Sequence, residues 1–207
     1  MVIQYFGLGF VKVSLGDEVL AFSPTSKNAD LKGPQFGANV GLIPLADKNY
    51  NGVEQITYAS RVPFVASGPG EYEVNGTFIK GVASSGSHDM VNTIYSVVFD
   101  NIRLCHLGAL AKADISGDVK EAIGDVDILF VPTYGDGVLD EAGAYKVLGA
   151  LSPKLVIPLF HTGKKDSLSK FFKECGEDQV KSIDRLTVKY KELEGKDSEI
   201  VPIASFE

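Results

Sequence analysis

Three histidines, His88, His106 and His161, are the side chains of this sequence best suited to bind a metal or to move a proton. Each stands at the end of an expected strand or in the loop beyond it, where layered α/β folds build their sites. His88 lies beside Asp89 in the loop SSGSHDM, and His161 follows the apolar run VIPLF. Either could be a ligand or a base, or a loop histidine without a task. His106, in the apolar run LCHLGAL, is typical of a neutral imidazole bonded to backbone.

Carboxylates supply weaker candidates. Glu71 and Glu73 fall on one face of an expected strand and could in principle act as acid and base, but a solvated strand face is the commoner explanation of such a pair. Asp136 stands between two glycines after a buried strand, where it borders either a pocket or a tight loop. The sequence has no dinucleotide fingerprint, Walker motif or Gly-x-Ser-x-Gly elbow, so nucleotide binding and serine-hydrolase chemistry have no support.

The overall composition narrows the class of protein. The 207 residues carry a net charge of −7 and are 44 % hydrophobic, so we expect one domain, 1–207, that does not bind nucleic acid. No signal-peptide pattern and no apolar run of about 18 residues occurs, which predicts a cytoplasmic protein that does not enter the membrane. Cys105 and Cys175 are predicted to be ordinary buried thiols.

The first half of the chain is rich in strand signals. Short β-branched runs at 2–6, 10–15, 18–23, 55–60 and 62–67 are separated by turn residues. Asn75-Gly76 and Asp100-Asn101 each separate two such runs, which predicts two successive hairpins over 71–107. The only long irregular stretch, 24–39, is predicted to be a surface loop.

From about residue 110, expected helices and strands alternate. Helices are predicted over 114–124 with Asp114 as the cap, over 140–153 with Asp140 as the cap, and from Asp166 to a stop at Gly176. The continuously apolar runs 126–132 and 154–160 indicate buried strands, and 184–190 and 198–204 return to strand. Strands first and βαβ units after predict an α/β (α+β) fold of two sheets with helices outside.

Four segments in order resemble one family: IQYFGLGFVKVSL near the start, GPGEYEVNGTFIKG, HDMVNTIYSVVFDNIRLCHLGAL, and the run from VDILFVPTYGDG to VIPLFH. Together they resemble the metallo-β-lactamase superfamily, in its branch of lactonase-like zinc-dependent hydrolases. The resemblance runs through nearly the whole chain and implies the αββα four-layer sandwich. It also implies a metal site, whose expected ligand positions can be located in this sequence.

The resemblance places the family's leading His-x-His-x-Asp-His signature on the stretch LADKNYNG, at Leu45, Asp47, Asn49 and Tyr50. All four positions differ from the signature. The stretch therefore resembles the metal loop of the family without its histidines.

Of the other family ligands, the resemblance matches one histidine to His88 and the last to His161, although the run PLFH is one residue longer than the family's Pro-x-His. The bridging aspartate falls on Ala109. A dinuclear centre of the family type is therefore not expected. Asp47, His88 and His161 remain as candidate ligands of one weak zinc or manganese site, because a catalytic zinc needs three protein ligands.

Two functions stay open at this point. The preferred hypothesis is a degenerate, non-catalytic member of the superfamily without a cofactor, which binds an unknown small molecule or protein or has a structural role. The alternative is a residual mononuclear metal-dependent hydrolase of a small ester, lactone or phosphodiester, in which His88 could also act as a base without metal. A homo-oligomer in which a partner chain completes the pocket is a further hypothesis.

Overall fold

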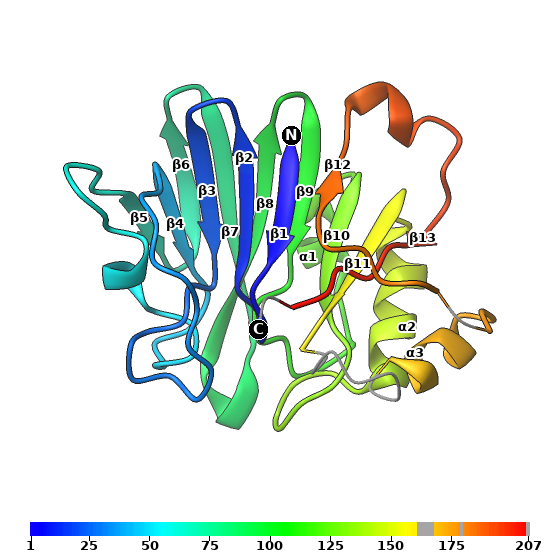
Figure 1. Ribbon diagram of the computed structural model, residues 1–207. Helices are drawn as coiled ribbons and strands as arrows, with labels where there is room; N and C mark the ends of the chain where they lie inside the picture. Colours follow the sequence, from blue (N-terminus) through cyan, green and yellow to red (C-terminus); the bar gives the residue numbers. More distant parts are fainter. Residues whose placement is uncertain (161–167, 179, 206–207) are drawn as a thin grey trace.

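The computed structural model describes residues 1–160, 168–178 and 180–205, and these form two β-sheets packed face to face (Figure 1). The first sheet has the strand order β12-β1-β2-β3-β4-β5 and the second β13-β11-β10-β9-β8-β7-β6. The strands of the first sheet are β1 Val2–Tyr5, β2 Val11–Leu15, β3 Glu18–Phe22, β4 Val40–Ile43, β5 Phe64–Ser67 and β12 Leu186–Thr187. Those of the second are β6 Gly70–Val74, β7 Thr77–Ser85, β8 Val91–Phe99, β9 Ile102–His106, β10 Ile128–Pro132, β11 Leu155–Leu159 and β13 Glu199–Ile200.

Both predicted hairpins are confirmed. Asn75 and Gly76 have φ values of 50° and 77° between β6 and β7, and Asp100 and Asn101 have φ values of 53° and 59° between β8 and β9. Two central residues with positive φ define the type I′ turn, whose twist matches that of the flanking strands. The expected strand over 55–60 is wrong, because a 3₁₀ helix, η1 (Val53–Gln55), and a tight turn occupy this stretch.

Of the two predicted helix caps that the structure describes, one is confirmed and one is wrong. The Asp140 carboxylate accepts the Gly143 N–H at 2.8 Å and starts α2 (Glu141–Leu151), as predicted. The predicted cap Asp114 is wrong, because the Ser116 hydroxyl accepts the Val119 N–H and starts α1 (Gly117–Ile123) two residues later.

The third predicted helix is described from its second half onward. Helix α3 spans Ser169–Glu174, and Gly176, with a φ of 76°, follows its end as predicted. The predicted start at Asp166 lies outside the described residues. None of the described helices is long and apolar enough to cross a bilayer.

The main hydrophobic core lies between the two sheets. Side chains of β1 to β4, such as Phe22 and Leu42, meet those of β7 to β11, such as Tyr95 and Phe130. The buried Tyr95 hydroxyl also donates to the Ile43 carbonyl of the opposite sheet at 2.9 Å. This bond joins the sheets at the end of β4, immediately before the segment 45–50.

The two outer faces are covered differently. Helices α1 to α3 pack on the seven-stranded sheet around a second core, which includes the buried Cys105 and, at its margin, the half-buried Cys175. Over the six-stranded sheet, the described chain instead places the irregular segment 24–39, where Phe36 stacks on Phe10 at 5.8 Å and lies under the Lys12 ammonium. The predicted loop is therefore irregular, but part of it serves as a cover for the sheet.

Candidate functional site

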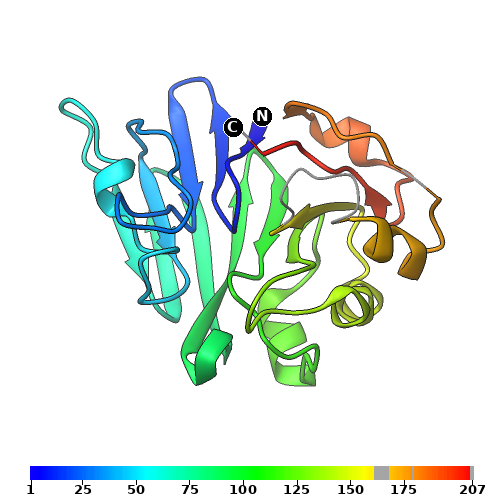
Figure 2. The ribbon, with the colours of Figure 1, turned by 60° about the horizontal axis from the view of Figure 1, so that its bottom comes forward.

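Four described segments meet at one end of the sandwich, the lower end in Figure 1, which comes forward in Figure 2. They follow β4, β7, β9 and β10, and backbone hydrogen bonds join them to one another and to the end of β11, including Ser87 N–H to the Ala109 carbonyl at 3.1 Å and Thr133 N–H to the Leu159 carbonyl at 3.3 Å. Strand ends collected in this way are where layered folds build their sites.

The stretch after β4 is a turn held by its own polar groups. The Asp47 carboxylate accepts the Asn49 N–H at 2.9 Å, and the Asp47 carbonyl accepts the Tyr50 N–H at 2.9 Å. The Asn49 amide bonds Asp30 of the segment 24–39, and Lys48 forms an ion pair with the same carboxylate. The side chain of Asp47 is thus half-buried and already engaged in the local turn.

Three neighbouring side chains at this end belong to the apolar core between the sheets. Leu45, Tyr50 and Ala109 are 2 %, 7 % and 0 % exposed, and the Tyr50 ring lies 6.1 Å from the ring of Phe160. Burial raises the pKa of Tyr50, and the nearby Asp47 carboxylate adds to this rise, while a hydrogen bond with the Ser87 side chain opposes it. The centre of this end is therefore filled by hydrocarbon and an un-ionised phenol.

Asn92 fixes the segment that carries Ala109. This buried amide accepts the Ala109 N–H at 2.9 Å and donates to the Leu107 carbonyl at 2.9 Å and to the Ser84 hydroxyl at 2.8 Å. Because a side chain at Gly108 would meet the Asn92 amide oxygen at 2.3 Å, the turn needs a glycine there. The network uses both N–H donors of the Asn92 amide and binds its oxygen to the Ala109 N–H, so the side chain is fixed in place.

His88 lies at the rim of this end in an unusual backbone conformation. His88 and Asp89 form part of the 3₁₀ turn η2 (Ser87–Asp89) with φ values of 53° and 60°, in the left-handed region that side chains rarely adopt. The His88 Nε2 atom lies 4.0 Å from the Asp136 carboxylate, and the two side chains are 63 % and 96 % exposed. Asp136 thus lies in an exposed loop opposite an imidazole, and the next two residues, Gly137 and Val138, rather than Asp136 itself, line the cavity described below.

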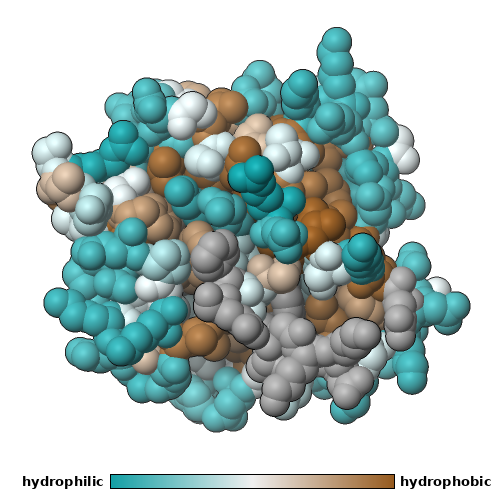
Figure 3. Space-filling model, in the orientation of Figure 1, coloured by the Kyte–Doolittle hydropathy of each residue, from teal (hydrophilic) through white to brown (hydrophobic). Residues whose placement is uncertain are grey.

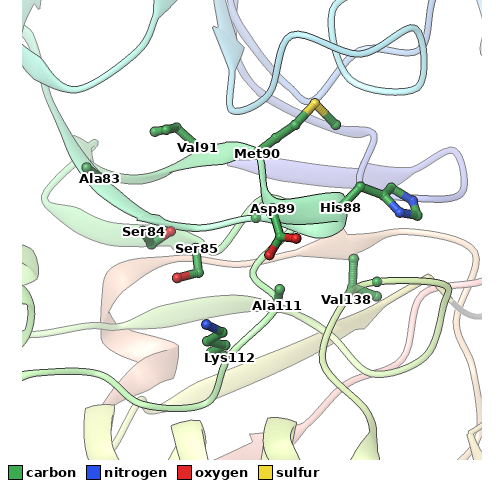
Figure 4. A pocket seen from close by; sticks show the side chains of 12 residues that line it. Ala83, Ser84, Ser85, His88, Asp89, Met90, Val91, Ala111, Lys112 and Val138 are labelled. Atoms are coloured by element: carbon green, nitrogen blue, oxygen red, sulfur yellow. The ribbon is translucent and has the colours of Figure 1, made fainter.

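Beside η2 lies a cavity of about 730 Å³. Ser85 at the end of β7, Asp89 on η2 and Lys112 after β9 point toward it, whereas the His88 ring is turned to the other side of the turn (Figure 4). Val91 and Val138 add apolar surface. A cavity of this size holds a small organic molecule and combines opposite charges with hydrocarbon.

His106 is structural, as predicted. Its ring is 1 % exposed, Nδ1 accepts the Gly108 N–H at 3.0 Å, and Nε2 lies 2.9 Å from the Gly9 carbonyl, to which it donates in this tautomer. The ring stacks on Phe22 at 5.2 Å. Burial lowers the pKa of His106 to about 4, although the Gly9 bond opposes this shift.

The structure places two of the three candidate ligands. Asp47 and His88 lie on neighbouring loops, joined through Tyr50 and Ser87, while His161 lies outside the described residues. Within 1–160, 168–178 and 180–205, no three His, Cys, Asp or Glu side chains gather closely enough to hold a metal ion. Aliphatic Leu45 and Ala109 offer no metal-binding atom, so the donor set described here does not fit a dinuclear centre of the family type. No step is derived through such a group.

The remaining candidates have simple roles, and the cavity residues carried little sequence signal. Glu71 and Glu73 lie on the exposed face of the edge strand β6, where Glu71 is 3.6 Å from the Lys80 ammonium. Lys112 was not singled out by any motif, because only the fold brings it to Ser85 and Asp89. The one available signal was Asp89 beside His88 in a loop between two hairpins.

Comparisons with known proteins address the fold. A solved structure of a proposed zinc-dependent hydrolase of the metallo-β-lactamase superfamily from Thermotoga maritima is 23 % identical, covers 99 % of both chains and has a TM-score of 0.79. A proposed metal-dependent hydrolase from Parabacteroides distasonis is 19 % identical over 85 % of this chain and 90 % of its own, with a TM-score of 0.64. A metallohydrolase from Ignicoccus hospitalis is 15 % identical over 91 % of this chain and 99 % of its own, with a TM-score of 0.62. No curated protein matches the chain.

Two face-to-face sheets with flanking helices, superposed on these structures over nearly their whole length, define the metallo-β-lactamase αββα fold. The sequence profile described as "Beta-lactamase superfamily domain" matches residues 2–160. The chain therefore belongs to this family.

Proposed function

We propose that this protein is a non-catalytic, ligand-binding member of the superfamily, whose cavity beside η2 takes a small molecule without a dinuclear metal centre. One observation carries the proposal. Leu45, Tyr50 and Ala109, at positions that the family resemblance assigns to ligands, pack into the core between the sheets.

The chemistry of these side chains supports the proposal. Zinc is bound by thiolate, imidazole and carboxylate groups, and a methyl or isobutyl group supplies none of these. The phenol of Tyr50 is held un-ionised by burial, because its pKa is raised. Bringing a divalent ion next to Leu45 and Ala109 would remove its hydration without replacing it.

The test is the metal content of untagged protein, purified without chelator from medium supplemented with zinc and manganese. We expect well under one metal ion per chain, and no change of the melting temperature when either ion is added at low micromolar concentration. About one metal ion per chain, or a rise of several degrees, would overturn the proposal.

A second function is favoured by a different observation, the 4.0 Å approach of His88 and Asp136 on the rim, together with the half-buried Asp47 nearby. The solved structures above are described as metal-dependent or zinc-dependent hydrolases. A residual mononuclear hydrolase would hold one zinc or manganese ion through Asp47, His88 and His161 and would act on a small ester, lactone or phosphodiester.

This hydrolase predicts turnover of such substrates that is lost in His88→Ala and in His161→Ala. Asp118→Asn, an exposed change on α1, serves as the matched control and should leave the rate unaltered. Turnover that survives both histidine substitutions would exclude this candidate.

A further inference from the structure

Three polar groups of the cavity lack protein partners. Across the described residues, the Ser85 hydroxyl, the Asp89 carboxylate and the Lys112 ammonium form no hydrogen bond or ion pair. Ion pairs elsewhere in the same part of the chain, such as Lys154 with Asp127 at 2.7 Å, involve none of these three groups. The unpaired groups point toward one cavity from three segments (Figure 4).

The backbone holds these groups in place. The Ser85 carbonyl accepts the Ala111 N–H at 2.9 Å, which fixes the segment of Lys112 beside the end of β7. On the other side, Ser85 pairs with Val91 of β8, two residues after Asp89. Ser85 therefore lies between the segments that carry the positive and the negative charge.

The conformation of η2 sets the direction of Asp89. Its φ of 60° follows the φ of 53° at His88. Two successive non-glycine residues in the left-handed region destabilise the folded state, so they persist only where the surrounding structure imposes this conformation. The turn directs the carboxylate of Asp89 into the cavity and the His88 ring away from it. An anionic and a cationic group thus line the same cavity without forming an ion pair with each other.

These features select the charge of the ligand. An anion would be repelled by Asp89 and by the net charge of −7, and a cation would be repelled by Lys112. A zwitterion can satisfy both charges at once. The exposed Val91, 68 % accessible, and the half-buried Val138 offer apolar surface to the rest of the ligand.

We propose that the cavity binds a free α-amino acid with an apolar side chain. Its ammonium group lies against Asp89, its carboxylate against Lys112 and the Ser85 hydroxyl, and its side chain against the two valines. This inference rests on the proposed binding function and names the ligand class of the same cavity.

The test uses L-leucine and two analogues that each lack one charge, 4-methylpentanoate and 3-methylbutylamine. Binding to the ¹⁵N-labelled protein is followed by chemical-shift changes at residues 83–91 and 110–113. We expect saturable binding of leucine and at least about tenfold weaker binding of each analogue, since each loses one charged contact.

Two substitutions assign the contacts. Asp89→Asn should weaken leucine binding about tenfold and strengthen that of 4-methylpentanoate, because the repulsion of its carboxylate is removed, and asparagine tolerates the left-handed conformation at this position. Lys112→Met should weaken leucine binding about tenfold and strengthen that of 3-methylbutylamine for the corresponding reason. The matched controls Asp114→Asn and Lys120→Met change exposed charges outside this cavity and should alter none of the affinities.

No saturable shift with leucine at about 10 mM, equal affinity for all three molecules, or affinities unaltered by both cavity substitutions would overturn the inference. The metal measurement separates this failure from that of the proposed function. Absent leucine binding in a metal-free protein removes only the amino-acid ligand, whereas one metal ion per chain removes the non-catalytic assignment.

Discussion

His106 and His88 are the same type of side chain, but one is buried and the other is exposed to solvent. His106 ends the regular strand β9, is 1 % exposed, and has both ring nitrogens satisfied by backbone groups. His88 lies in a left-handed turn with an exposed ring, 4.0 Å from the carboxylate of the exposed Asp136. A ligand or a proton can therefore reach His88 without disturbing the core, and it cannot reach His106 in that way.

The same contrast extends to the surroundings of each residue. Around Ala109, the buried amide of Asn92 is held by three hydrogen bonds, and the neighbouring side chains are packed hydrocarbon. Near His88, the charged groups of Asp89 and Lys112 face a cavity and form no ion pair with any described residue. The space-filling view shows a surface that is mainly hydrophilic, with apolar patches between polar side chains (Figure 3). Partner-free charges in a cavity, rather than histidines as such, thus mark the region available for binding.

The largest effect is expected from a carboxylate introduced at the buried position 109. Ala109→Asp should destabilise the protein by about 3–5 kcal/mol, because position 109 is fully buried and offers the new group no partner. Urea unfolding measures the effect, and Ala46→Asp at an exposed position is the control, expected to be nearly neutral.

An Ala109→Asp variant that keeps its unfolding midpoint and gains stability with zinc would contradict the contrast. It would mean that position 109 faces an open site after all and that the fold retains room for a metal ion.

The second prediction compares the two histidines by pH. The pKa of His106 is about 4 in the folded protein and near 6.5 in the unfolded chain, so the unfolded state binds more protons between these values. The contribution of the neutral His106 side chain to the free energy of unfolding is fully present above pH 6.5 and is lost as the pH falls toward 4. The free energy of unfolding should therefore fall between pH 7 and pH 4 by about 3 kcal/mol more in the wild type than in His106→Gln.

Urea titrations at several pH values measure this difference, and His88→Gln is the matched control. Because His88 is exposed, its substitution should leave the pH slope of the wild type intact. An unaltered slope in His106→Gln would show that the buried imidazole is not the group responsible.

The elements of the fold were predictable where a local signal decides them. Asn75-Gly76 and Asp100-Asn101 fix their hairpins because the type I′ turn needs two positive φ values at those positions. Asp140 was predictable as a helix cap for the same reason, because its carboxylate accepts the N–H of Gly143, only three residues away. The predicted cap at Asp114 failed because Ser116, two residues on, is an equally suitable cap residue, and the choice between two such neighbours is not visible in the sequence.

The site was less predictable, since contacts between distant segments create it. The environment of His106 could be inferred from the apolar run around it, and the position of Asp136 from its glycines. The presence of Asp89 and Lys112 in one cavity could not be inferred from the sequence. No motif marks Lys112, and it reaches the cavity because the Ala111 N–H bonds the Ser85 carbonyl. Nothing in spacing alone distinguishes that lysine from the other exposed ones.

The smallest expected effect concerns the backbone of η2. His88→Gly and His88→Ala both remove the imidazole, but only glycine adopts a φ of 53° without steric cost. We expect His88→Gly to be more stable than His88→Ala by about 1 kcal/mol, measured by urea unfolding. At position 106, in a regular strand, the order should reverse, because glycine there only adds freedom to the unfolded chain. An equal stability of the two His88 variants would mean that η2 relaxes out of the left-handed region once the ring is gone, and the carboxylate of Asp89 would then no longer be directed into the cavity.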